Sequence, residues 1–421
     1  MFQFIHTADI HLDSPLRGLE RYDGAPADAI RAASRRALEN LVELAIDERV
    51  AFVLVAGDLY DGDWKDYNTG LFLVGQMAKL KEAEIAVLII SGNHDAASQI
   101  TRHLHLPENV TLLSSRRPQT VLLPEVDVAV HGQGYATRAV TEDLSKSYPT
   151  AETGLFNIGL LHTSLTGREG HASYAPCTVE GLGAKGYDYW ALGHVHQLEV
   201  VCKDPWIVFP GNIQGRHARE TGAKGCTLVT VEDGAVCEVD HRDLDVLRWV
   251  LCEVDANGAS STDEITERVR EALGAELERV GEQTLAVRVH IYGATEAHGD
   301  LAANPEHWRN EIRATALDLG AERIWIEKLR LRTQSVADLD AILARDDALG
   351  SLLAAIRELR SNDDQLGELT RLFDDLRPKL PGDLTSGEDG LDLQHPETMR
   401  QAIDDARELL LAGLLSEGDA R

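Results

Sequence analysis

The chain has 421 residues, of which 43% are hydrophobic, and a formal net charge of -29. This length and apolar content exclude a wholly disordered chain and predict two or three domains. The charge excludes a general nucleic-acid coat, because an acidic surface repels phosphate at long range. It leaves open a nuclease whose basic side chains gather at a cleft.

Cysteine spacing and the lack of long apolar runs predict the compartment. The five cysteines form no CxxC pair and no disulfide framework, which is typical of free thiols in a reducing environment. No apolar run reaches membrane-spanning length, and the first residues form a strand-like run without a basic, apolar leader. We therefore expect a soluble, cytoplasmic protein with no membrane partner.

Residues 1–242 alternate apolar strand-like runs with helical patterns. Apolar residues recur at helical spacing over 28–46 and 68–81, while short strands dominate after Val110. An α/β start followed by a β-rich half predicts a sandwich of two mixed β-sheets flanked by helices. We predict that this catalytic domain ends at residue 242.

Two further segments follow the predicted break at 240–245. Residues 245–332 read as β-α-β-α-β, with a capping-box sequence at 261–264 that opens the first helix. Residues 333–421 are rich in Leu and Ala at helical spacing and carry 20 acidic and 9 basic residues, a net charge of -11. The first segment is predicted to be a small α/β capping domain, and the second a helical C-terminal region.

Five predicted strands end in side chains that can bind metal. Because neighbouring strands in a sheet bring their ends together, residues far apart in the sequence can converge there. The seven candidate ligands are Asp9, His11, Asp58, Asn93, His162, His194 and His196.

The types of these ligands predict the chemistry. A mixed set of oxygen and nitrogen donors without thiolate favours manganese, iron, zinc or cobalt, and manganese is our first choice. Seven ligands exceed the needs of one ion, so we expect two ions that share Asp58 and hold a hydroxide for attack on phosphorus. His94 is the additional imidazole, available to protonate the leaving oxygen.

The motifs that carry these residues resemble those of the calcineurin-like metallophosphoesterases. The motifs are Asp9-x-His11, Gly57-Asp58-x-x-Asp61, Gly92-Asn93-His94-Asp95, His162 and Gly193-His194-x-His196. The details HTADIHLDSPL, GHVHQ and PGNIQGRHARETGAKG are similar to the DNA-repair exonuclease branch of the YhaO type, which is related to the SbcD nuclease subunit. The resemblance covers roughly residues 1–240.

The resemblance implies roles for individual residues. One metal would be held by Asp9, His11, Asp58 and His196, and the other by Asp58, Asn93, His162 and His194. His94 would be the catalytic acid, with Asp95 as a catalytic partner that orients it.

Several residues remain candidates for contact with substrate. Some relatives have a catalytic histidine where this chain has Asp61. The role of Asp61 therefore has two interpretations, a substrate contact or a loop or cap residue. His171, Arg216 and His217 are candidates for phosphate contact.

The implied function is a two-metal phosphodiesterase acting on DNA in repair, a 3'-5' exonuclease with endonuclease activity. A phosphodiesterase for cyclic nucleotides or other small esters is the first alternative, and it suits the acidic charge. The second is a non-catalytic scaffold, although the complete ligand set argues against it. The C-terminal helices suit a protein partner, for which the resemblance supplies an SMC-like ATPase, and a homodimer is a further expectation.

Overall fold

The computed structural model describes residues 1–14, 27–61, 67–97, 104–165, 174–320, 323–336, 339–376, 379–380 and 395–418. Contacts divide the chain into two units. The first contains residues 1–251 and short pieces at 280–287 and 322–327, and the second contains the remainder. The predicted domain boundaries at 242 and 332 stay predictions.

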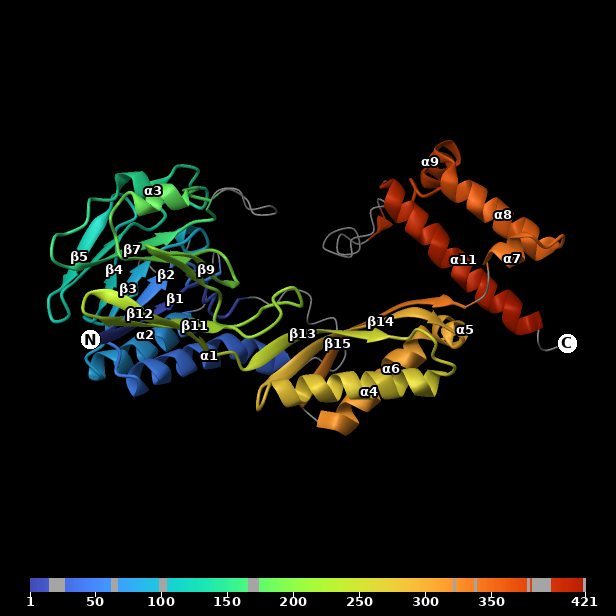
Figure 1. Ribbon diagram of the computed structural model, residues 1–421, viewed down its shortest axis with the longest axis horizontal. Coiled ribbons are helices and arrows are strands. Elements are labelled where there is room, and N and C mark those ends of the chain that lie inside the picture. Colours follow the sequence, from blue (N-terminus) through green and yellow to red (C-terminus); the bar gives the residue numbers. More distant parts are fainter. Residues whose placement is uncertain are drawn as a thin grey trace. The chain divides into compact units, whose positions relative to one another are not determined.

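Two six-stranded sheets form the core of the first unit (Figure 1). The first sheet has the order β12 (Ala235–Asp243), β11 (Gly225–Glu232), β1 (Phe2–Thr7), β2 (Phe52–Ala56), β3 (Ala86–Ile90) and β4 (Val110–Leu112). The second has the order β5 (Gln119–Leu123), β6 (Val128–Gly132), β7 (Phe156–His162), β8 (Tyr189–Gly193), β10 (Trp206–Pro210) and β9 (Leu198–Lys203). Each sheet is mixed: in the first, β1 to β4 are parallel and β11 is antiparallel to both β1 and β12, while in the second β6, β7, β8 and β10 are parallel and the edge strands β5 and β9 are antiparallel to them.

The sheets pack face to face through a continuous apolar layer. Phe4, Phe52 and Leu88 of the first sheet belong to the same buried cluster as Ile158 and Tyr189 of the second. Strands buried on both faces have no polar side to alternate, which is why β2 reads as an unbroken apolar run. The prediction of a two-sheet sandwich is confirmed.

Helices cover the outer faces of the sandwich. The helices α1 (Ala27–Asp47) and α2 (Tyr67–Glu82) lie within two residues of their predicted bounds and bury Leu41 and Met77 against the first sheet. The short helices η3 (Leu144–Ser147) and α3 (Val179–Gly183) lie over the second sheet, where Leu182 packs in a cluster with Trp190. The remaining short helix, η2 (Asp95–Ala97), follows β3.

The predicted β-α-β-α-β segment forms a three-stranded sheet with helices. Its strands have the order β13-β14-β15. The bounds are β13 (Leu247–Asp255), α4 (Thr262–Arg279), β14 (Thr284–Thr295), α5 (His298–Ala303), α6 (Pro305–Gly320) and β15 (Ile324–Ser335). One half of the predicted capping box forms, because Ser261 Oγ accepts from Glu264 N at 3.3 Å. The Glu264 carboxylate accepts instead from Ser260 N, one residue before the cap, at 3.0 Å.

The described part of the C-terminal region is mostly helical, as predicted. Its helices are α7 (Leu339–Leu343), α8 (Ala348–Ser361), α9 (Asp363–Leu372) and α11 (Pro396–Gly418). They pack through two small apolar clusters, one centred on Leu366 and Met399 and the other on Leu353 and Leu411. No described helix combines the length and the apolar character needed to cross a bilayer.

Candidate metal centre

The seven predicted ligands lie at the carboxyl ends of β1, β2, β3, β7 and β8, and the structure brings them together. The two sheets meet at these ends: His162, the last residue of β7, bonds through Nδ1 to the carbonyl of Ala56 in β2 at 2.8 Å. Gly193 at the end of β8 permits this approach, since a Cβ there would lie 1.9 Å from the same carbonyl oxygen. The convergence predicted from the strand pattern is therefore present.

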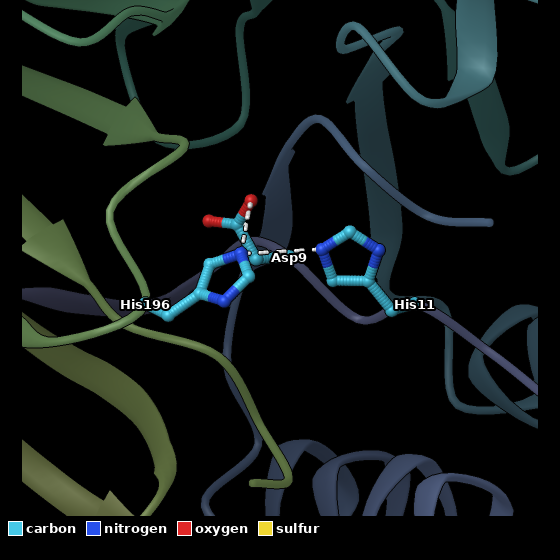
Figure 2. A group of neighbouring side chains, drawn as sticks. All are labelled: Asp9, His11 and His196. Carbon is cyan, nitrogen blue, oxygen red and sulfur yellow. Dashed lines mark hydrogen bonds and ion pairs between the residues drawn. The ribbon is translucent and has the colours of Figure 1, made fainter. Parts of the chain in front are cut away.

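Asp9, His11 and His196 form the first group of ligands (Figure 2). His196 Nε2 lies 3.2 Å from His11 Nε2 and 3.7 Å from Asp9 Oδ1. The Asp9 oxygen that faces the group, Oδ1, is buried and has no hydrogen-bond partner among the described residues, while Oδ2 accepts from His194 N at 2.9 Å. Two imidazole nitrogens and a carboxylate oxygen directed at one point are a donor set that fits a divalent cation.

Asp58, His162 and His194 form the second group. Asn93 adds an oxygen, because its Oδ1 lies 3.0 Å from His162 Nε2. Asp58 lies between the two groups: its Oδ2 is 3.5 Å from His162 Nε2 and 3.9 Å from His11 Nε2. Its Oδ1 accepts from His94 N at 2.9 Å, which fixes the carboxylate in this orientation. The geometry fits two ions that share Asp58.

The backbone at the ligands adopts conformations that residues with side chains rarely adopt. Asp9, His11 and Asp58 have φ values of 51°, 44° and 51°, and His194 has a φ of 101°. Such conformations cost about 1–3 kcal/mol each and persist only where the surroundings enforce them. Here Asp9 N and His11 N donate to the carbonyls of Gly57 and Asp58, both at 3.0 Å. The loops after β1 and β2 therefore hold one another in place.

Burial shifts the ionisable ligands toward their neutral forms. It raises the pKa of Asp58 to about 6 and, with the neighbouring Asp58 charge, raises that of Asp9. It also lowers the pKa of His162 to about 3 and that of His11 well below its usual range. Arg216 places positive charge near both buried carboxylates, and a divalent cation would add to it and favour their ionised forms.

His94 lies beside the two groups, and its backbone amide contacts Asp58. Its Nδ1 is 2.6 Å from Asp61 Oδ1, and this carboxylate raises the pKa of His94. Burial opposes the ionisation of Asp61, but His94 and Ser14 outweigh it and lower the pKa of Asp61. Asp61 is thus the carboxylate that contacts the His94 ring.

The contacts of Asp95 differ from those expected of a residue that orients His94. Its carboxylate accepts from three backbone amides, those of Leu59, Tyr60 and Gly92, at 2.9–3.1 Å. It therefore ties the loop after β2 to the loop after β3. Among the described residues no hydrogen bond or ion pair joins it to the His94 ring, and a catalytic role for Asp95 stays a prediction.

The segment after β10 supplies further polar groups at the site. Arg216 Nη1 lies 3.4 Å from Asp61 Oδ2, and Arg216 Nη2 lies 3.8 Å from Glu220 Oε1. His217 lies 3.5 Å from the same Glu220 oxygen, with its side chain 54% exposed. Contact of Arg216 and His217 with phosphate stays a prediction, and His171 lies outside the described residues.

Glu220 and Ser14 are residues that the sequence reasoning missed. Glu220 Oε1 lies 2.6 Å from His196 Nδ1, and Ser14 donates to Asp61. A signal for Glu220 was present, because it is the one acidic residue in the segment PGNIQGRHARETGAKG.

Comparison with protein families gives two matches. Residues 2–198 match the family model described as calcineurin-like phosphoesterase, and residues 249–334 match the model described as the middle domain of metallophosphoesterase YhaO. The first match contains all seven candidate ligands, and the second covers β13 to β15.

Three relatives extend the comparison over most of the chain. The uncharacterized metallophosphoesterase YhaO of Bacillus subtilis is 33% identical over 343 residues, covering 80% of this chain and 83% of the relative. The DNA double-strand break repair protein Mre11 of Methanopyrus kandleri is 24% identical, covering 85% of this chain and 76% of the relative. Mre11 of Halobacterium salinarum is 25% identical, covering 85% and 92% respectively.

Proposed function

The chain belongs to the calcineurin-like metallophosphoesterases, and from this premise we propose that it is a DNA phosphodiesterase of repair, a 3'-5' exonuclease with endonuclease activity. Membership of the family makes it a hydrolase of phosphate esters that uses two divalent metal ions. The observation that carries the proposal is the pair of ligand groups joined through Asp58, with His94 beside them.

The candidate ligands would bind the two ions as two groups. One ion would be held by Asp9, His11 and His196. The other would be held by His162, His194 and Asn93, and Asp58 would bind both ions. When bound, the ions polarise the phosphoryl oxygens and lower the pKa of the attacking water. We assign manganese to both positions, because the oxygen and nitrogen donors suit it and no thiolate is present in either group.

His94 would act as the general acid. The Asp61 carboxylate at its Nδ1 favours the protonated ring and leaves Nε2 as the nitrogen that donates to the leaving oxygen. The side chain is 32% exposed, so an incoming substrate can reach it. Asp61 would then be a positioning residue for His94 and not a direct substrate contact.

DNA is favoured as the substrate for two reasons. Two relatives are named as DNA double-strand break repair proteins. In addition, burial and the charges of Arg330, Arg332 and Arg288 lower the pKa of His290. Three arginines of β14 and β15 therefore lie near this histidine of β14. Such local positive charge can contact a phosphate backbone although the whole chain is acidic.

A small phosphodiester, such as a cyclic nucleotide, is the second candidate, because the net charge of -29 opposes the approach of a polyanion. The test compares duplex DNA labelled at either end with a small chromogenic diester, in manganese and at several salt concentrations. We expect mononucleotides to be released from 3' ends, and DNA cleavage to fall as salt rises. Cleavage of the small diester with intact DNA under all conditions would contradict the proposal.

We also propose that the C-terminal helices bind an SMC-like ATPase that controls access to the nuclease. Large apolar side chains remain exposed at the end of α9 and along α11: Leu372, Leu376, Leu409, Leu410 and Leu414. A protein surface would cover them, whereas the acidic charge of this region disfavours DNA. Co-purification of the two proteins tests this, with a chain that ends at Thr333 as the comparison.

We assign the activity to the cytoplasm. All five cysteines are free thiols, and three of them are buried. Free thiols suit a reducing compartment. Fractionation of cells with an antibody to the protein tests the assignment.

A further inference from the structure

His196 is held differently from His11 and His162. The rings of His11 and His162 are fully buried, whereas the His196 side chain is 24% exposed. His162 is fixed by a backbone carbonyl inside the sandwich. His196 lies beyond the end of β8, in a loop. Its orientation must therefore come from side chains outside the sheet.

Glu220 supplies that constraint on the ring. Its Oε1 lies 2.6 Å from His196 Nδ1, and its Oε2 accepts from Asn212 Nδ2 at 2.9 Å and from Arg216 N at 2.7 Å. Glu220 is 7% exposed. These contacts immobilise the carboxylate with one oxygen facing the ring.

Lys224 holds the backbone of the same residue. Its Nζ donates to the His196 carbonyl at 2.9 Å, and the residue is only 6% exposed. Glu220 and Lys224 are four positions apart in one segment. This segment therefore fixes both the ring and the main chain of His196.

The contact with Glu220 decides which ring nitrogen can bind metal. A neutral imidazole has one protonated nitrogen, and a carboxylate can only accept. The proton therefore resides on Nδ1, which leaves the lone pair on Nε2 directed at the point that Asp9 Oδ1 and His11 Nε2 also face. Partners of this kind fix the tautomer and raise the basicity of the ligand.

We propose that Glu220 is a positioning residue that fixes the tautomer and orientation of His196, and so controls metal affinity at Asp9, His11 and His196 selectively. The inference rests on the proposed two-metal function. The side-chain hydrogen bonds of Glu220 are with His196 of the first group and, through its other oxygen, with Asn212 and Arg216, so the second group should bind its ion without it. Loss of Glu220 should weaken one of the two sites by about 10- to 100-fold, the usual effect of removing such a partner.

The test is a calorimetric titration of the full-length, metal-free protein with manganese alone. We expect two sites in the natural protein and in the control Glu238→Gln, which changes an exposed carboxylate on β12. In Glu220→Ala one site should weaken 10- to 100-fold while the other changes less than two-fold. Glu220→Gln should show a smaller loss, because its amide oxygen can still accept from Nδ1.

A second measurement separates positioning from structural support. Nitrogen NMR of the metal-free protein with labelled histidine should show His196 protonated on Nδ1, and a mixture of tautomers in Glu220→Ala. If Glu220→Ala does not fold, Glu220→Gln, which has the same shape, provides the affinity measurement, and a smaller loss confined to one site is expected. Unchanged affinity at both sites, or equal weakening of both, would overturn the inference.

The outcome can be separated from that of the proposed function. If DNA is not cleaved but the selective loss of one site is observed, the substrate assignment fails and the role of Glu220 stands. If DNA is cleaved and Glu220→Ala retains two unaltered sites, the proposed function stands and the role of Glu220 fails.

Discussion

Gly92 lies against the carboxylate that the two ligand groups share, so Gly92→Ala tests the arrangement with a single methyl group. A Cβ at this position would lie 2.2 Å from Asp58 Oδ1 and 2.7 Å from Asp58 N. Gly92 does not have the left-handed backbone that disfavours alanine, so the steric conflict is the main effect. Because one contact is with a backbone nitrogen, a rotation of the Asp58 side chain cannot relieve it.

The magnitude follows from the packing. Insertion of a methyl group into a closely packed site costs about 1–3 kcal/mol, which for a unit of this size corresponds to a fall in melting temperature of about 2–12 °C. The displaced carboxylate would no longer face His11 and His162 together. We therefore expect weaker binding of both ions and loss of hydrolysis, because each ion loses a ligand.

The assay combines thermal unfolding, metal content after equilibration with manganese, and the rate of diester cleavage. The matched control is Gly75→Ala on α2, where no atom lies within 4 Å of the new methyl group. Alanine there should leave metal content and rate unchanged and stabilise the helix by up to about 1 kcal/mol. Two ions and the natural rate in Gly92→Ala would refute the placement of Asp58 between the groups.

Four further predictions concern individual roles. Asp58→Asn should lower metal content at both sites and His196→Ala mainly at one, as measured by elemental analysis; full occupancy in the first variant would exclude bridging. His94→Gln should keep both metals and lose about 10²- to 10⁴-fold in turnover, with the greater loss on diesters with poor leaving groups; equal losses on all leaving groups would contradict the acid role. Asp61 raises the pKa of His94, and an acid works only below its pKa, so Asp61→Asn should move the alkaline limb of the pH-rate profile to lower pH; an unmoved limb would remove Asp61 from this role. A chain ending at Thr333 should fold, bind metal and cleave a small diester at nearly the full rate, yet not bind the ATPase; an insoluble or metal-free product would show that the helices belong to the core.

The sequence was sufficient to predict the sandwich and the seven candidate ligands. The physical reason is local: a strand buried on both faces is apolar along its whole length, so the first polar residues after it mark its end. Asp58 after β2 and His194 after β8 are found in this way. The carboxyl ends of neighbouring parallel strands meet at one edge within each sheet, and the packing of the two sheets brings both edges together.

The partners of the carboxylates were decided only by the tertiary structure. Asp61 and Asp95 lie in motifs of similar character, yet Asp61 contacts the His94 ring while Asp95 accepts from loop amides. The two carboxylates reach the site from different loops, because Asp61 follows β2 and Asp95 follows β3. Glu220 comes 24 positions after His196, from another loop, and touches its ring. Contacts of this kind depend on loop paths and side-chain directions, which leave no regular pattern in the sequence. A buried strand does leave a pattern, because its apolar run ends at the first polar residues.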